Sequence, residues 1–137
     1  MSLKDLKDYF KTNFLIGEST WTNSISIGKI DNNSEKAICF YNSQVNLPYQ
    51  GIIGGKNNKS TKKKPITILL RYGKNKNDAE SMATSIYEFF EERTFYINNK
   101  RVFVEMLYEA PNDLGTDDNN VYEYSIEMYM YVCEMEG

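Results

Sequence analysis

The longest alternating pattern in the chain runs from Val121 to Glu134, and it constrains the fold more than any other feature. Apolar residues fill its even positions from Tyr122 to Val132, while Glu123 and Glu127 stand at odd positions between them. Successive side chains of a strand point to opposite faces, so this period of two predicts one long strand with a buried face. Tyr129 and Tyr131 extend the odd face, which predicts partial cover on the second side as well.

Further strands are indicated along the chain. The run Ile66 to Tyr72 is almost continuously apolar, which is typical of a central strand covered on both faces. Residues 21–30 and 36–41 have strand composition and flank an Asp-Asn-Asn-Ser turn, so we expect them to form a hairpin. Residues 95–109 contain their own Asn-Asn turn and are expected to form a second hairpin.

Two segments have the three-and-four spacing of amphipathic helices. In residues 2–14, Ser2 and Asp5 have the spacing of a capping box, and a single apolar stripe follows. In residues 77–93, Asn77 has the spacing of a cap, and again one face is apolar. Each helix has only one stripe to bury, so both are expected on one face of the sheet. The predicted fold is α+β, a single domain over 1–137 with a mostly antiparallel sheet and two helices.

Residues 42–64 sustain no period and are rich in Lys, Gly and Asn. A structureless segment longer than about 15 residues is usually functional or disordered. We therefore expect a long, mobile loop, serving either as a solvated linker or as a contact with an acidic protein surface or nucleic acid. Lysine runs without interleaved aromatic residues do not indicate sequence-specific nucleic-acid binding. The lysines of this loop are Lys56, Lys59, Lys62, Lys63 and Lys64.

Composition excludes most enzyme classes. The chain has no His, and Cys39 and Cys133 form no CxxC pair, which removes His-based nucleophilic machinery and thiolate metal sites. Glycine-rich phosphate-binding motifs are absent from the sequence. Apolar runs are shorter than the roughly 18 residues that cross a bilayer, and the start of the chain does not resemble a signal peptide. We expect a cytosolic product without enzymatic activity, cofactor or membrane association.

The acidic segment 111–120 could be mistaken for a calcium loop. Its Asp113, Asp117 and Asp118 lack the ligand order and terminal Glu of an EF-hand, so a solvated connection between strands is the better interpretation. No catalytic, cofactor-binding or metal-binding residue is predicted.

Charge is divided unevenly along the sequence. Residues 1–76 hold 13 Lys and Arg against 5 Asp and Glu, a net charge of +8. Residues 77–137 hold 3 against 14, a net charge of −11. Two interpretations stay open: the halves interleave and their charges mix, or the molecule has a basic and an acidic face suited to head-to-tail association.

Two stretches carry a family resemblance. In the first, a strand ending at Arg71 is followed by the alanine-bearing helix that contains Met82 to Phe90. In the second, a Pro-x-x-Leu-Gly-x-Asp loop, Pro111 to Asp117, precedes the Tyr-Ser strand Tyr122 to Glu127. These stretches, within residues 64–132, resemble the phage minor-capsid and tail-terminator family. Thr116 and Glu127 stand where members often carry Arg and Asn.

The resemblance implies a non-enzymatic virion protein assembled in the bacterial host cytoplasm. It implies a ring, usually a hexamer, that caps the head-proximal end of a tail tube, stops its polymerisation and joins it to the neck. Phage-tail-like bacteriocins use similar caps. The implied partners are other copies of the chain, the tail tube protein, the sheath protein of a contractile tail, and a neck or head-completion protein. The alternative is a small cytosolic binding module, for example for single-stranded nucleic acid.

Opposed charges would suit such a ring, because a heterologous contact joins two different patches of one protein. We predict that the basic half of one copy meets the acidic half of the next. The predicted interface residues are Lys56, Lys59, Lys62, Lys63, Lys64, Arg71, Asp113, Asp117 and Asp118.

Overall fold

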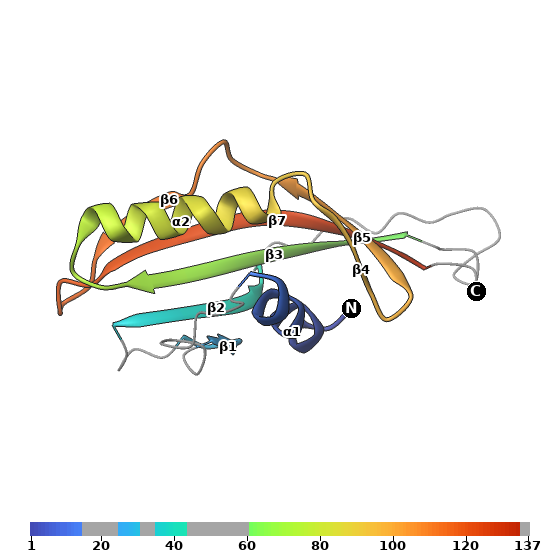
Figure 1. Cartoon of the computed structure of the whole chain (residues 1–137), viewed down its shortest axis with the longest axis horizontal. Coiled ribbons are helices and arrows are strands. Elements are labelled where there is room, and N and C mark those ends of the chain that lie inside the picture. Colours follow the sequence, from blue (N-terminus) through green and yellow to red (C-terminus); the bar gives the residue numbers. More distant parts are fainter. Residues whose placement is uncertain (15–24, 31–34, 44–60, 135–137) are drawn as a thin grey trace.

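The computed structural model describes residues 1–14, 25–30, 35–43 and 61–134 (Figure 1). These residues form two helices and one mixed sheet, which confirms the α+β prediction. In chain order the elements are α1 (Leu3–Asn13), β1 (Ile25–Ile27), β2 (Lys36–Asn42), β3 (Thr61–Tyr72), α2 (Lys76–Phe90), β4 (Thr94–Ile97), β5 (Lys100–Met106), β6 (Asn112–Thr116) and β7 (Tyr122–Glu134).

The sheet is built around its two longest strands, β3 and β7. The strand order is β1-β2-β3-β7-β5-β4, and every pair except β1–β2 is antiparallel. β3 and β7 pair from Thr61 opposite Cys133 to Arg71 opposite Glu123. The other edge of β7 is shared, because β5 pairs with its end and β6 pairs with its start.

Both helices cover the same face of this sheet, as their single apolar stripes predict. α2 lies along β3 and β7, and α1 lies against β1, β2 and β4 (Figure 1). One continuous core joins the two helix stripes to the even positions of β3 and β7. Its fully buried large side chains include Phe10, Phe40, Phe90, Ile68, Ile86, Ile126, Met128 and Met130. Buried Thr67 confirms that β3 is also covered on its second face.

Capping explains where the helices begin and end. Ser2 and Asp5 form the predicted capping box of α1. α2 begins earlier than predicted, because the side chain of Asn75, rather than Asn77, accepts the backbone N–H of Asp78 at 3.1 Å. It also ends earlier, at Phe90, because Glu92 adopts a left-handed conformation with φ of 53° that no helix can continue.

The predicted hairpin of residues 21–30 and 36–41 is wrong in its direction. β1 and β2 are parallel, with Ile25 opposite Ile38. Gly28, at φ of 83°, donates its N–H to the carbonyl of Phe40 at 2.9 Å. The parallel register requires the chain to return to the level where β1 begins before β2 starts at Lys36. A tight hairpin turn would have left the strands antiparallel.

Three element boundaries differ from the sequence prediction. In the first two cases, β7 pairs with more of the backbone than the sequence pattern indicates. Thr61–Lys64, predicted as loop, belongs to β3 and pairs with the end of β7. Residues 112–116, also predicted as loop, form β6 beside its start. The strand predicted to reach Glu109 stops at Met106, and residues 107–111 leave the sheet between β5 and β6. The rest of the predicted loop, 44–60, lies outside the described residues.

Candidate assembly surfaces

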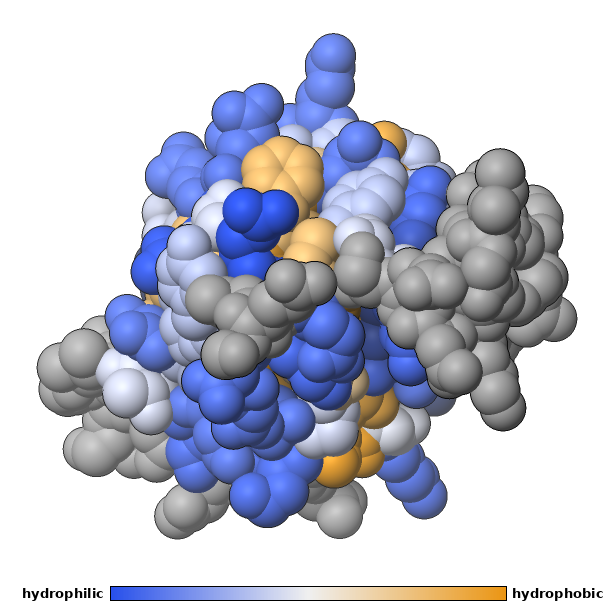
Figure 2. Space-filling view, turned by 90° about the vertical axis from the view of Figure 1, so that its right-hand side faces the viewer, coloured by the Kyte–Doolittle hydropathy of each residue, from blue (hydrophilic) through white to orange (hydrophobic). Residues whose placement is uncertain are grey.

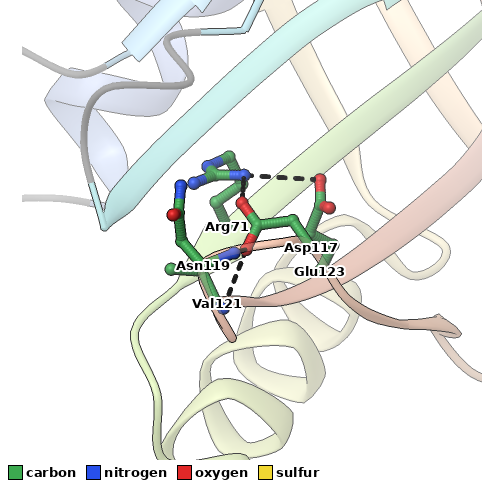
Figure 3. A network of polar contacts seen from close by, with 5 residues as sticks. All are labelled: Arg71, Asp117, Asn119, Val121 and Glu123. Atoms are coloured by element: carbon green, nitrogen blue, oxygen red, sulfur yellow. Dashed lines mark hydrogen bonds and ion pairs between the residues drawn. The ribbon is translucent and has the colours of Figure 1, made fainter.

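A buried ion pair fixes one end of the sheet. Arg71, on β3, is 2% exposed, and its Nη1 donates to Oδ2 of Asp117 at 2.5 Å. The carboxylate of Glu123, opposite Arg71 on β7, lies 3.9 Å from the same nitrogen. Figure 3 shows the guanidinium lying close to both carboxylates. The pair therefore fastens the turn between β6 and β7 to the central strand.

Asp117 also organises that turn from within. Its Oδ1 accepts the backbone N–H of Asn119 at 2.8 Å and of Val121 at 3.0 Å. The hydrogen bond from Val121 and the bond from Arg71 hold the pKa of the Asp117 carboxyl below its usual range. Arg71 and Asp117, both predicted as interface residues, are therefore partners inside one chain.

The other predicted acidic residues remain on the surface near this end. Asp113 accepts the backbone N–H of Gly115 at 2.8 Å, and its carboxylate lies 3.6 Å from Nζ of Lys76. Asp118 is exposed. Whether either residue contacts a neighbouring copy stays a prediction.

The predicted basic residues lie at the opposite end of β3. Lys62 pairs in register with Val132, nine positions along β3 from Arg71. At about 3.3 Å per residue, roughly 30 Å separate the two ends. The lysines and aspartates are therefore not brought together within one molecule, and their meeting between copies stays a prediction. Lys56 and Lys59 lie outside the described residues.

The three consecutive lysines have different surroundings. Nζ of Lys64 donates to the carbonyl of Met1 at 3.0 Å, and burial lowers the pKa of its ammonium. Nζ of Lys63 lies 4.0 Å from the ring centroid of Tyr129 and 5.6 Å from that of Tyr131. Lys62 is exposed. Only Lys63 belongs to the face of β3 that points away from the helices.

That face carries an exposed aromatic and basic surface, which we call the outer sheet face. Lys63, Tyr131 and Phe103 are in register across β3, β7 and β5, and Arg101 and Tyr96 are paired in the next row. Phe103 is 41% exposed and Tyr96 61% exposed. Figure 2 views the end of the molecule where β4 and β5 lie, and shows apolar atoms among hydrophilic ones.

Sequence reasoning missed the outer sheet face. The available signal was in 101–105, where Arg101, Phe103 and Glu105 alternate with two buried valines. Glu105 accepts a hydrogen bond from the hydroxyl of Tyr131 at 3.2 Å.

The solvent side of α2 is acidic, and we call it the acidic helix face. It consists of Glu80 and Glu88 on the helix, with Glu91 and Glu92 directly after it. Among the described residues, no Lys or Arg forms an ion pair with any of these four carboxylates.

A shallow groove of about 390 Å³ lies between the end of α2 and residues 103–109. The hydroxyl of Tyr87 donates to the carbonyl of Tyr108 at 2.6 Å and holds this segment against the helix. Leu107 is 39% exposed and Tyr108 52% exposed. The acidic helix face is thus continuous with an apolar strip.

The described part of the chain lacks the features of a metal site and of a membrane-spanning helix. It contains no group of three His, Cys, Asp or Glu residues placed to hold a metal ion. None of its helices is long and apolar enough to cross a membrane. Cys39 is buried, which raises the pKa of its thiol, and Cys133 is partly exposed; both are free.

Comparison with known protein families gives one match. A family model described as bacteriophage tail terminator protein matches residues 15–132. The match includes all of 64–132 and extends through β1 and β2, so it spans α2 and the sheet except for the last two residues of β7. No curated protein matches the chain.

Proposed function

Since the chain belongs to the bacteriophage tail terminator family, we propose that it forms a closed ring on the head-proximal end of a tail tube. Family membership itself gives the chain a structural role in a phage tail and interactions with other tail components. The proposal adds that the ring ends tube polymerisation and joins the tube to the neck. It also makes the protein a non-enzymatic component of the virion or of a phage-like particle.

The extent of the family match is the observation that carries this proposal. It covers residues 15–132, and therefore both central strands, α2 and the turn held by Arg71 and Asp117. The surfaces described above support self-association, because acidic and basic groups lie on different parts of the molecule. Such an arrangement suits a heterologous contact, which closes into a ring when its rotation allows.

The partners follow from the proposed position in the tail. One side of the ring would contact the tail tube protein, and the sheath protein too in a contractile tail. The other side would contact a neck or head-completion protein.

Tube assembly tests the proposal directly. Tail tube protein from the same particle is polymerised alone and with the purified chain, and tube lengths are measured by negative-stain electron microscopy. We expect shorter tubes that carry a ring at one end. Tubes of unchanged length with bare ends would contradict the capping role.

A second candidate function is binding of single-stranded nucleic acid. The observation that favours it is the cation of Lys63 over Tyr129, because such proteins combine cations with aromatic stacking platforms. Glu105, on the same face, would repel phosphate groups and weakens this candidate. The test is the fluorescence anisotropy of a labelled oligonucleotide. If the anisotropy rises when the monomeric protein is added, and the protein does not form rings, nucleic-acid binding is favoured over the capping role.

A further inference from the structure

We infer that the acidic helix face of one copy docks on the outer sheet face of the next copy. This inference rests on the proposed function and deepens it, because it names the two surfaces that close the ring. It also replaces the predicted pairing of Lys62–Lys64 with Asp113, Asp117 and Asp118 as the main polar contact between copies.

The two surfaces lie on opposite sides of the molecule. Even positions of β3 and β7, such as Ile68 and Ile126, are buried beneath the helices. Odd positions point the other way, because side chains of a strand alternate between faces. Lys63 and Tyr131 are odd, so this part of the outer sheet face is separated from the solvent side of α2 by the sheet and the core. Phe103, at the edge of the outer sheet face, lines the same groove as Glu91 and Glu92. When two copies join through two such different patches, each copy still has one patch uncovered. Further copies can therefore bind in the same way.

The cations Lys63 and Arg101 outnumber the one carboxylate, Glu105, on the outer sheet face, and their charge is opposite to that of the acidic helix face. Glu80, Glu88 and Glu91 have no cationic partner in an ion pair with any residue that the structure describes. Likewise, within the described ranges no carboxylate forms an ion pair with Lys63 or Arg101. Opposite potentials across an interface orient the partners and speed their encounter.

The carboxylates of the acidic helix face are also unfavourable where they stand at the end of α2. The C-terminal end of a helix carries partial negative charge and favours Lys or Arg, yet the last turn of α2 contains no basic residue and includes Glu88. Glu92 occupies a left-handed position that favours glycine. Departures from local rules are expected at functional sites, and a cationic neighbour would compensate for the carboxylates near the C-terminal end of α2.

Apolar contacts would supply most of the free energy of association between copies. Phe103 and Tyr96 on the outer sheet face are exposed, as are Leu107 and Tyr108 beside the end of α2. Aromatic residues are enriched at the centres of protein interfaces. Exposed ion pairs alone contribute little, so the charges set the orientation of the contact while the aromatic and apolar side chains are buried in it.

Charge reversal with rescue between copies tests the inference. One variant carries Lys63→Glu and Arg101→Glu, and a second carries Glu88→Lys and Glu91→Lys. Each alone would place like charges across the interface, so we expect each to lose the ring and sediment as a folded monomer. An equimolar mixture restores opposite charges at every contact, and we expect it to regain the mass of the parent ring. Both losses should be smaller in 1 M salt, where screening shortens to about 3 Å.

Matched controls separate this effect from net charge. Lys29→Glu with Lys74→Glu makes the same charge change as the first variant, at exposed positions outside the two surfaces. Asp8→Lys with Glu35→Lys matches the second variant in the same way. Both controls should keep the ring. Circular dichroism with a cooperative thermal transition establishes that each variant is folded, and a misfolded variant would not be rescued by mixing.

The outcomes distinguish the inference from the proposed function. Rings formed by the parent and by both reversal variants alike would overturn the docking surfaces and leave the capping role intact. Reversal variants that lose the ring but are not rescued by mixing would also overturn the pairing of these two surfaces. A parent that stays monomeric under all conditions and does not cap tubes would overturn the proposed function itself.

Discussion

Arg71 is the residue whose role depends most on three-dimensional placement. Its guanidinium is buried, and a buried charge is stable only when it is paired and hydrogen-bonded. The sequence singled out both Arg71 and Asp117, but they are 46 positions apart, and no sequence pattern indicates that their side chains meet. In the structure, these two predicted interface residues form an ion pair within one chain.

Removing the cation should destabilise the fold. Arg71→Leu would leave the carboxylates of Asp117 and Glu123 close together without their shared partner. We expect the free energy of unfolding to fall by roughly 2 kcal/mol, measured by urea denaturation. Lys29→Leu is the control, because Lys29 is exposed and lies outside the two proposed docking surfaces, and it should change stability by less than about 0.5 kcal/mol. Equal effects of the two substitutions would contradict the structural role of Arg71.

Asp117 should make stability depend on pH in the acid range. Its pKa is lower in the folded protein than the ordinary value of 3.8, so folding favours the ionised carboxylate. The resulting stabilisation is complete above the unfolded pKa and disappears as pH falls through the lower folded pKa. Urea denaturation of the parent and of Asp117→Asn between pH 2 and 6 measures this. Stability of the parent should fall more steeply below about pH 4 than that of the variant, and parallel curves would argue against it.

At the scale of elements, periodicity predicted most of the helices and strands, but it did not predict which strands pair or in which direction. The alternating pattern located β7, and the single apolar stripes placed both helices on one face. Periodicity is a local property, so it could not show that β1 and β2 run parallel. β6 was missed because Asn112–Thr116 has no alternating pattern and forms a strand only where the edge of β7 is available.

Ile86 tests the assignment of the buried helix face. It is fully buried beneath α2, so Ile86→Asp would place an unpaired charge in the core and should abolish soluble folding. Ser85→Asp, one position along on the solvent side, should fold normally. The measurement is the soluble fraction on expression followed by circular dichroism. Normal folding of the Ile86 variant would mean that the helix face is misassigned.

Glu88 should affect stability and assembly in opposite directions. Glu88→Lys places a cation in the last turn of α2, where it interacts favourably with the helix dipole, and should stabilise the monomer by about 0.3–1 kcal/mol. The same substitution should weaken the ring. Asp78→Lys, in the first turn, is the matched control and should destabilise the monomer. Thermal unfolding and sedimentation measure the two effects. Unchanged assembly of Glu88→Lys would count against the role of the acidic helix face.

At the scale of the whole molecule, the charges of the two halves mix at one site, while a basic face and an acidic face suited to head-to-tail association stay a prediction. Arg71, from the basic half, pairs with Asp117 from the acidic half, so some charges are neutralised internally. Other charges stay exposed on opposite sides of the sheet, and the outer sheet face takes Arg101 from the acidic half. The net charges of the two segments therefore predicted that charge is unevenly distributed over the molecule. Where the charged groups lie depends on strand alternation and on the position of α2.

Closure into a ring is the central claim, and the native mass of the purified chain tests it most directly. Light scattering after size exclusion should give one species whose mass is constant on dilution. Six copies of the 16.0 kDa chain predict a mass of about 96 kDa. A single species near 16.0 kDa at every protein and salt concentration would contradict the claim.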